Sequence, residues 1–339
     1  MTWRYDEWKA AHDLPVGVSE RAPLGQQVRA GDVIATGTTY GAPVRVAGAR
    51  HIGVAPRDLG RVMRVSVGAE VKKGMVVART GRRFARAVSS PIDGRIAHVR
   101  GDGDIEIAPI VDRWTVRSTL DGRVTESTES TVTVEGSAWC LQAVAAFGPD
   151  AIGELALAVG TAGEEIVPSR VDVTQRGRIL VAGGRSGAEA IARAHACGVA
   201  AVVAGAVPAA GLRAVFGDAT TAHGAPSQTD LPTVLCLLGF GSAQLPLSLF
   251  APFRDLASAR AAIHTASARL FVFAAAGAVA IPMPSSVALH AEWGAVRPLD
   301  GPVTMADETR FASERSTRAV MTSEGPVPAA NVIALAASR

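Results

Sequence analysis

The chain has 339 residues, of which 48% are hydrophobic and 19% are charged. This composition excludes a disordered or collagen-like chain, and the length predicts two or three domains. The net charge of +3 is too small to select a nucleic acid, a membrane or an acidic protein as the partner. Basic residues gather near the N-terminus, since residues 1–120 hold 19 Lys and Arg against 12 Asp and Glu.

The cysteines and the hydropathy pattern predict a cytoplasmic protein. Cys140, Cys197 and Cys236 show no C-x-x-C spacing, which argues against a disulfide framework and against a zinc knuckle. The first thirteen residues are too polar for a signal peptide. Two uncharged segments, 231–253 and 270–289, approach the length of a membrane span, but prolines and glycines interrupt both. We expect buried strands and loops there and no membrane contact.

A short pattern occurs twice in the N-terminal region. Residues 28–35 and 71–78 align without gaps as V-x-x-G followed by β-branched residues, which predicts a strand, a tight hairpin turn with glycine at positive φ, and a second strand. Pro91-Ile-Asp93-Gly94 then predicts another turn between two strands. Residues 111–147 repeat the theme in degraded form, so we place them in the same domain, 1–147.

The order V-x-x-G-x-x-x-A followed by S-P-x-D-G-x-I-x-x-V, over residues 20–110, resembles the lipoyl/biotinyl-type barrel-sandwich hybrid. Carrier members of that family modify a lysine about eight residues before the Ser-Pro pair. Arg83 occupies this position, and arginine cannot form the amide, so the resemblance implies a non-carrier domain without a cofactor. The basic hairpin that remains is a candidate contact for a phosphate or an acidic partner through Arg79, Arg82, Arg83 and Arg86. The alternative is a solvated turn.

Residues 178–204 predict a β-α-β unit with parallel strands: a strand over 178–182, a glycine-rich turn, a helix over 188–197 and a strand over 199–204. Glycines before a helix can present backbone N–H groups to an anion. The candidate anion site therefore consists of Gly183, Gly184, Ser186 and Gly187. The alternative is that the glycines only let strand and helix approach, with Ser186 as the N-cap.

Further elements complete a small α/β domain over residues 148–285: a strand over 232–238, a helix over 253–270 and a strand over 271–274. The composite pattern of this region and the preceding sandwich is similar to a family of largely uncharacterised bacterial proteins. In those relatives Thr-Glu precedes the Gly-Phe-Gly motif, whereas this chain has Leu237 and Leu238. A ligand role built on the Thr-Glu pair therefore does not transfer.

The C-terminal segment, 286–339, predicts short strands at 286–292, 295–298, 317–322 and 331–335, with turns at 298–302 and 324–328. It looks like an SH3-like barrel of the KOW type, a family that often contacts RNA or RNA polymerase. Its charges are balanced, so it offers no basic face by count.

The predicted fold class is α+β, mostly β, with a barrel-sandwich hybrid, a small β-α-β layered domain and an SH3-like barrel. No histidine shows a metal-binding spacing, and no nucleophile motif is present, so we predict no metal, no cofactor and no catalytic residues. The sequence favours a non-enzymatic binding, scaffold or assembly protein whose partner is another protein or a second copy. Two alternatives stay open: an accessory subunit that binds a phosphate-bearing small molecule, and a protein associated with RNA or RNA polymerase.

Overall fold

The computed structural model describes residues 3–81, 85–217 and 230–279, together with strands between residues 287 and 333. The chain is mostly β with a smaller helical part, so the predicted mostly-β, α+β class is confirmed. Among the described residues, no helix has the length and apolar character needed to cross a membrane.

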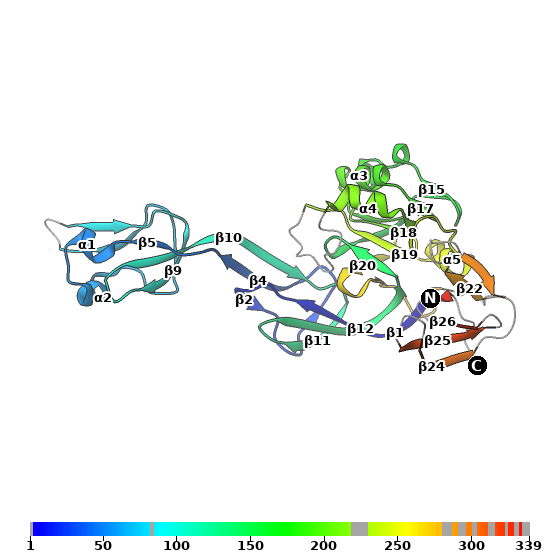
Figure 1. Cartoon of the computed structure of the whole chain (residues 1–339), viewed down its shortest axis with the longest axis horizontal. Helices are drawn as coiled ribbons and strands as arrows, with labels where there is room; N and C mark the ends of the chain where they lie inside the picture. Colours follow the sequence, from blue (N-terminus) through cyan, green and yellow to red (C-terminus); the bar gives the residue numbers. More distant parts are fainter. Residues whose placement is uncertain are drawn as a thin grey trace. The chain divides into compact units, whose positions relative to one another are not determined.

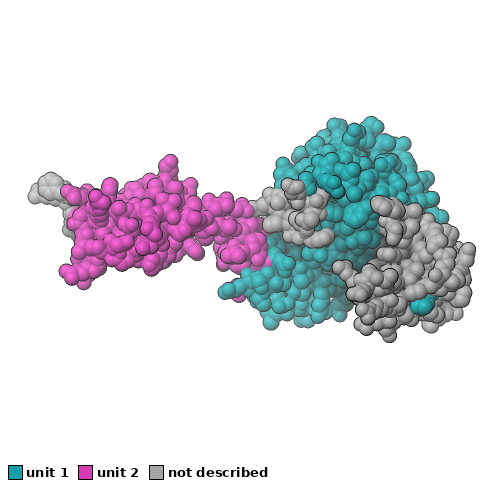
Figure 2. All heavy atoms as spheres, viewed as in Figure 1, with its two compact units in different colours: residues 1–13, 22–34, 116–339 teal, residues 14–21, 35–115 magenta. Residues whose placement is uncertain are grey.

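The chain divides into two compact units, which Figure 2 colours separately. The large unit comprises residues 1–13, 22–34 and 116–339, and the small unit comprises residues 14–21 and 35–115. These units do not coincide with the predicted domains 1–147, 148–285 and 286–339. The physical reason is that one long strand, residues 131–142, pairs with strands from both sides of the predicted boundary.

A 13-stranded sheet forms the large unit, in the order β13-β19-β18-β16-β14-β20-β21-β12-β11-β3, with β1 paired to β12 and with β15 and β17 beside β18. Its strands are β1 (Trp3–Asp13), β3 (Gln27–Val28), β11 (Gly122–Ser127), β12 (Thr131–Gln142), β13 (Ala145–Phe147), β14 (Ala151–Leu157), β15 (Glu165–Ile166), β16 (Arg178–Val181), β17 (Arg185–Ser186), β18 (Ala201–Val207), β19 (Val234–Phe240), β20 (Arg260–His264) and β21 (Arg269–Val272).

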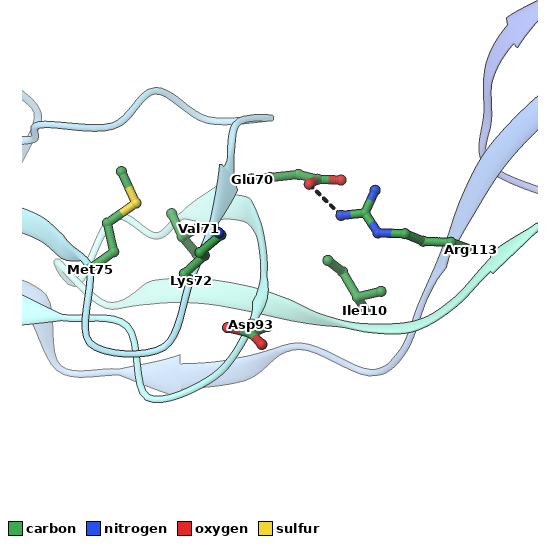
Figure 3. Close-up of a pocket in the computed structure, with 7 residues that line it drawn as sticks. All are labelled: Glu70, Val71, Lys72, Met75, Asp93, Ile110 and Arg113. Atoms are coloured by element: carbon green, nitrogen blue, oxygen red, sulfur yellow. Dashed lines mark hydrogen bonds and ion pairs between the residues drawn. The ribbon is translucent and has the colours of Figure 1, made fainter.

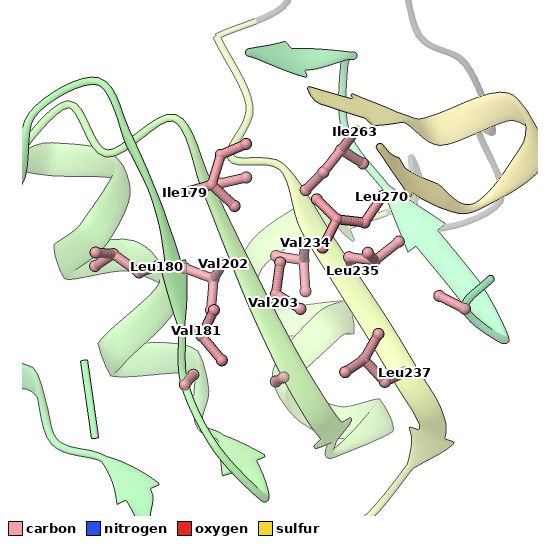
Figure 4. Close-up of a cluster of buried hydrophobic side chains, with 14 of the residues drawn as sticks. Ile179, Leu180, Val181, Val202, Val203, Val234, Leu235, Leu237, Ile263 and Leu270 are labelled. Atoms are coloured by element: carbon pink, nitrogen blue, oxygen red, sulfur yellow. The ribbon is translucent and has the colours of Figure 1, made fainter. Parts of the chain in front are cut away.

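The centre of this sheet is parallel, and its middle strand β18 is buried along its whole length. Strands β14, β16, β18 and β19 run parallel, and Ile179 of β16 pairs with Ala201 of β18, which confirms the predicted β-α-β unit. Helices α3 (Ala188–Ala196) and α4 (Ala209–Phe216) lie next to each other on this part of the sheet (Figure 1), and α5 (Leu247–Asp255) follows β19. All seven residues of β18 are buried, as expected for a parallel strand covered on both faces. Figure 4 shows how branched side chains of β16, β18 and β19 fill the core together with Ile263 of β20 and Leu270 of β21.

The predicted helix over 253–270 is wrong. The helix is α5, which ends at Asp255, and residues 260–264 form β20 between β14 and β21. Ser258 and Ala268 adopt positive φ angles of 65° and 50°, which break any helix on both sides of the strand. Alanine-rich sequence favours a helix, but burial between two strands overrides that preference here. The following strand, β21, begins at Arg269, two residues earlier than predicted.

The small unit contains a six-stranded sheet in the order β2-β4-β10-β9-β6, with β5 paired to β10, and a separate hairpin of β7 and β8. Its apolar core includes Ile52, Leu59, Val77, Ile96 and Ile107. Its elements are β2 (Val18–Arg21), β4 (Val33–Tyr40), β5 (Val44–Val46), α1 (Gly48–Ile52), η1 (Pro56–Asp58), α2 (Leu59–Val62), β6 (Glu70–Val71), β7 (Val76–Arg79), β8 (Ala87–Ser89), β9 (Gly94–Val99) and β10 (Ile105–Arg117).

The second copy of the repeated pattern closes with a hydrogen-bonded clasp. The Asp93 carboxylate accepts a 2.7 Å bond from the backbone N–H of Lys73, and the N–H of Gly74 donates to the Ser90 carbonyl at 2.8 Å. The Ser90 hydroxyl in turn donates to the carbonyl of Ile92 at 2.6 Å. The Pro-x-Asp-Gly turn therefore holds the V-x-x-G turn by side-chain and backbone bonds together.

The first copy has the same clasp in the large unit. Asp121 accepts a 2.7 Å bond from the N–H of Ala30, and the N–H of Gly31 donates to the Ser118 carbonyl at 2.9 Å. The Ser118 hydroxyl donates to the carbonyl of Leu120 at 2.6 Å. The match extends the repeat, because S-x-L-D-G at 118–122 corresponds to S-x-I-D-G at 90–94.

The strands on either side of each V-x-x-G turn are not hairpin partners, contrary to the sequence prediction. Strand β3 pairs with β11 and β6 pairs with β9, whereas β4 and β7 join other partners. The predicted positive φ is correct at Gly31 (102°) and Gly74 (84°). Glycine at this position of a type II turn redirects the chain, and the aspartate clasp fixes the new direction.

The described strands of the C-terminal segment form two three-stranded antiparallel sheets, β23-β22-β27 and β24-β25-β26. Residues 325–328, predicted as a turn, form β26 at the edge of the second sheet. Prolines are tolerated there because an edge strand need not donate on both sides. The strands are β22 (Val287–His290), β23 (Val296–Leu299), β24 (Thr304–Arg310), β25 (Ser316–Thr322), β26 (Gly325–Pro328) and β27 (Val332–Ile333).

Candidate functional site

A pocket of about 470 Å³ lies wholly within the small unit, beside the clasp. Figure 3 shows the side chains that line it, which combine two carboxylates, two cations and three apolar groups. They come from β6, from the turns that follow it and precede β9, and from β10. The lining residues are Glu70, Val71, Lys72, Met75, Asp93, Ile110 and Arg113.

Strand alternation and the turn explain this arrangement. Val71 points into the core and is buried, so its neighbour Glu70 faces outward. The chain then leaves β6 at the V-x-x-G turn, which places Lys72 at the rim, and Met75 follows with 45% of its surface exposed. Because the clasp fixes the turn, the rim residues have a defined backbone.

One wall of the pocket is a paired charge network. Arg113 donates to Glu70 across 2.7 Å, as the dashed line in Figure 3 shows, and the Tyr40 hydroxyl donates to the other Glu70 oxygen at 3.1 Å. Arg95 lies 4.3 Å from the centre of the Tyr40 ring. The hydrogen bond from Arg113 holds the pKa of Glu70 below its usual value, so Glu70 is ionised at neutral pH. Burial, together with Glu70, raises the pKa of Tyr40.

Lys72 is the pocket charge that these contacts leave uncommitted. Glu70 and Arg113 pair with each other, and one oxygen of Asp93 accepts the bond from the Lys73 backbone. The Lys72 ammonium makes no ion pair or hydrogen bond with the described residues. An ammonium beside Val71, Met75 and Ile110 can hold an anionic group that carries a short apolar body.

The glycine-rich turn predicted as an anion site packs closely against other backbone. A Cβ at Gly184 would lie 2.5 Å from the carbonyl oxygen of Ala243, and a Cβ at Gly183 would lie 2.4 Å from that of Glu164. The N–H of Gly184 donates to the Glu164 carbonyl at 3.0 Å. These two glycines thus let three backbone segments meet, and the Gly184 amide is used inside the protein.

The N-terminus of α3 differs from the prediction in one further respect. Gly187 is the N-cap, whereas Ser186 belongs to the short strand β17. Ser186 is wholly buried and its hydroxyl has no hydrogen-bond partner among the described residues. The Glu165 carboxylate lies 3.6 Å from the Cβ position of Gly187 and forms an ion pair with Arg185 at 3.1 Å. A carboxylate of the chain itself therefore lies near this helix end.

The basic hairpin is described in part. Strands β7 and β8 pair antiparallel, with Arg79 opposite Ala87, and the N–H of Thr80 donates to the Arg86 carbonyl at 2.9 Å. The predicted contact residues Arg82 and Arg83 lie outside the described residues.

Sequence reasoning missed a histidine–carboxylate cluster in the large unit. His12, Asp150 and His264 bring one candidate ligand atom each to within 4.8 Å of one another. The rings of His12 and His264 are 5.0 Å apart at their centres. Burial, reinforced by His264, lowers the pKa of His12 to about 4. No spacing rule finds this set, because more than a hundred residues separate each member from the next.

Comparisons with known proteins do not assign the site: no family model matches the chain, and neither a curated protein nor a solved structure matches it.

Proposed function

We propose that the protein is a non-enzymatic binding or assembly protein of the bacterial cytoplasm, and that its small unit holds a partner by an anionic group at Lys72. The observation that carries the proposal is the uncommitted ammonium at the rim of a partly apolar pocket. Glu70 and Arg113 neutralise each other, and Asp93 already accepts a backbone N–H. An incoming carboxylate or phosphate therefore gains a charge-assisted hydrogen bond from Lys72 without breaking an ion pair.

In this proposal the small unit is a lipoyl-like barrel-sandwich domain that has no carrier role. The hairpin of β7 and β8, with its connecting residues, contains no lysine, so it has no amine for a biotinyl or lipoyl amide. The clasp around Asp93 supports the resemblance, because the Ser-Pro-x-Asp-Gly turn is tied to the V-x-x-G turn. A rigid domain without a modified residue suits contact with a partner.

A second candidate function is association with RNA or RNA polymerase through the C-terminal segment. Its support is the pair of three-stranded antiparallel sheets over residues 287–333, an arrangement compatible with a small SH3-like barrel of the KOW type. A gel shift with single-stranded RNA over a range of salt concentrations tests it, since phosphate contacts make affinity fall steeply with salt.

Lysine-selective NMR tests the leading proposal sharply, because the chain has only three lysines, Lys9, Lys72 and Lys73. Reductive methylation with ¹³C keeps the charge and gives each amine its own signal, which Lys-to-Arg variants assign. The probes are butyrate, inorganic phosphate and a short acidic peptide. We expect at least one probe to shift the Lys72 signal saturably and to leave the Lys9 signal unchanged.

Two variants form a matched pair on the same turn. Lys72→Gln should abolish probe binding, whereas Lys73→Gln should keep it, because the contact of Lys73 with Asp93 uses the backbone. A Lys72 signal that none of the three probes moves, or equal losses in the two variants, contradicts the proposal.

A further inference from the structure

The strongest unassigned feature of the large unit is the cluster of His12, Asp150 and His264. Its members come from three separate parts of the chain: His12 from β1, Asp150 from the position before β14, and His264 from the end of β20. Both histidines are buried, and Asp150 is half-buried. We propose that this cluster is a binding site for a divalent transition-metal ion of the zinc type, which takes imidazole and carboxylate ligands.

His12 has a nitrogen that the protein does not satisfy. Its Nε2 accepts a bond from the backbone N–H of Thr119 at 3.1 Å and lies 3.0 Å from the Thr119 hydroxyl. Because a backbone amide only donates, Nε2 has its lone pair there and Nδ1 carries the proton of the neutral ring. Nδ1 is buried and has no hydrogen-bond partner among the described residues. A buried donor without an acceptor is costly, and a metal ion bound at Nδ1 removes this donor, because the ring proton then moves to Nε2.

His264 is already oriented as metal-binding histidines are. Its Nε2 lies 3.1 Å from the Ala11 carbonyl, which only accepts, so Nε2 carries the ring proton. Nδ1 therefore has the lone pair, and the Ser267 hydroxyl donates to it at 2.7 Å. A ring held by a backbone carbonyl at one nitrogen, with its lone pair at the other, is the usual arrangement of a metal ligand and its outer partner.

Asp150 supplies the negative charge that a cation needs. One carboxylate oxygen accepts bonds from the N–H and the hydroxyl of Thr265, both at 2.8 Å, which fixes the side chain. Asp150 forms no ion pair with the described residues, and its second oxygen makes no hydrogen bond with them. Because Asp150 is the least buried member, an ion enters from its side.

Metal binding requires small side-chain movements. Three atoms on one tetrahedral ion lie about 3.4 Å apart, given zinc bonds of about 2.0–2.2 Å, so the cluster must close from its present span of up to 4.8 Å. His264 exchanges the Ser267 hydroxyl for the ion. At His12 the ion binds Nδ1, and the ring proton moves from Nδ1 to Nε2. The protonated Nε2 then donates to the Thr119 hydroxyl, and the hydrogen bond from the Thr119 backbone N–H to Nε2 is lost. The proton count of the neutral ring is unchanged.

Titration of the full chain, after treatment with a chelator, tests the site. Co²⁺ is followed by its visible absorption and Zn²⁺ by calorimetry, with Mg²⁺ as the comparison because it disfavours imidazole. We expect one equivalent of Co²⁺ or Zn²⁺ to bind, no Mg²⁺ binding at the cluster, and a rise in melting temperature with metal concentration.

Asp150→Asn and His264→Gln should each weaken Zn²⁺ affinity by at least about tenfold. His195→Gln is the control, since His195 lies 3.0 Å from Asp230 in a histidine–carboxylate pair outside the cluster. If His264→Gln does not fold, Asp150→Asn decides alone, because Asp150 is only half-buried. The proposal is overturned if Zn²⁺ does not bind saturably, or if the control loses as much affinity as Asp150→Asn.

Discussion

Replacement of Gly184 by alanine tests whether the glycine-rich turn exists for close packing. The new Cβ would lie 2.5 Å from the Ala243 carbonyl oxygen and 3.2 Å from that of Ala162. Both neighbours are backbone atoms, so they cannot turn away as a flexible side chain can. Gly184 does not have a positive φ, which means that lack of space, and not backbone strain, is the cause tested.

The expected cost follows from these contacts. Overpacking of a well-packed region costs about 1–3 kcal/mol, and the entropy that alanine removes from the unfolded chain returns about 0.4–1 kcal/mol. We expect Gly184→Ala to lower the free energy of unfolding by about 1–2 kcal/mol, which for a unit of this size is a fall in melting temperature of about 2–8 °C.

Gly187→Ala is the matched control in the same turn. Its Cβ would meet only the Glu165 carboxylate, at 3.6 Å, an ordinary van der Waals distance. Alanine is a weaker N-cap than glycine, but it also lowers the conformational entropy of the unfolded chain. These two effects offset each other, so the free energy of unfolding should change by no more than about 0.5 kcal/mol. Urea unfolding followed by circular dichroism measures both variants. Equal stabilities of Gly184→Ala and Gly187→Ala would refute the packing explanation.

Three further outcomes follow from contacts described above. Burial raises the pKa of both Cys140 and Cys236 to about 12, so at pH 8 only about one in ten thousand of these thiols is ionised, and both should resist maleimide until the protein unfolds. Modification of either in the native state at the unfolded rate contradicts this. Asp93→Ala removes the 2.7 Å bond to the Lys73 amide and should destabilise the small unit by about 1–2 kcal/mol in urea, whereas an unchanged midpoint refutes the clasp. Glu70→Gln removes a negative charge from the pocket wall and should raise butyrate affinity about two- to fivefold by NMR titration; a loss of affinity would show that Glu70 takes part in binding.

Local patterns in the sequence predicted the parts of the fold whose contacts are local. The β-α-β unit around α3 was found because an apolar strand, a glycine turn and a one-faced helix follow one another within thirty residues. The positive φ of Gly31 and Gly74 was predicted because glycine is the residue that adopts positive φ in a tight turn without steric strain. The residues over 260–264 were misassigned because an alanine-rich segment has no period of its own, and only its neighbours β14 and β21 make it a strand.

The candidate sites depend on contacts between residues far apart in the sequence, which local patterns do not predict. The role of Lys72 depends on which of the other pocket side chains form ion pairs. Arg113, which pairs with Glu70, is 43 residues from Glu70 in the sequence. The cluster of His12, Asp150 and His264 depends on β1 and β20, whose histidines are 252 residues apart in the sequence. Neither arrangement leaves a spacing in the sequence, so only three-dimensional pairing could show them.

The two aspartate clasps close loops of very different length, which has a consequence for folding. The bond between Lys73 and Asp93 spans 20 residues, whereas the bond between Ala30 and Asp121 spans 91, because the main segment of the small unit lies inside that loop. Loop closure costs about 1 kcal/mol more for the longer span if the chain is flexible. If residues 35–115 fold first, an ordered segment replaces most of the flexible loop between Ala30 and Asp121. The entropy cost of joining Ala30 to Asp121 is then smaller. We therefore expect the small unit to acquire its structure before the folding of the large unit is complete.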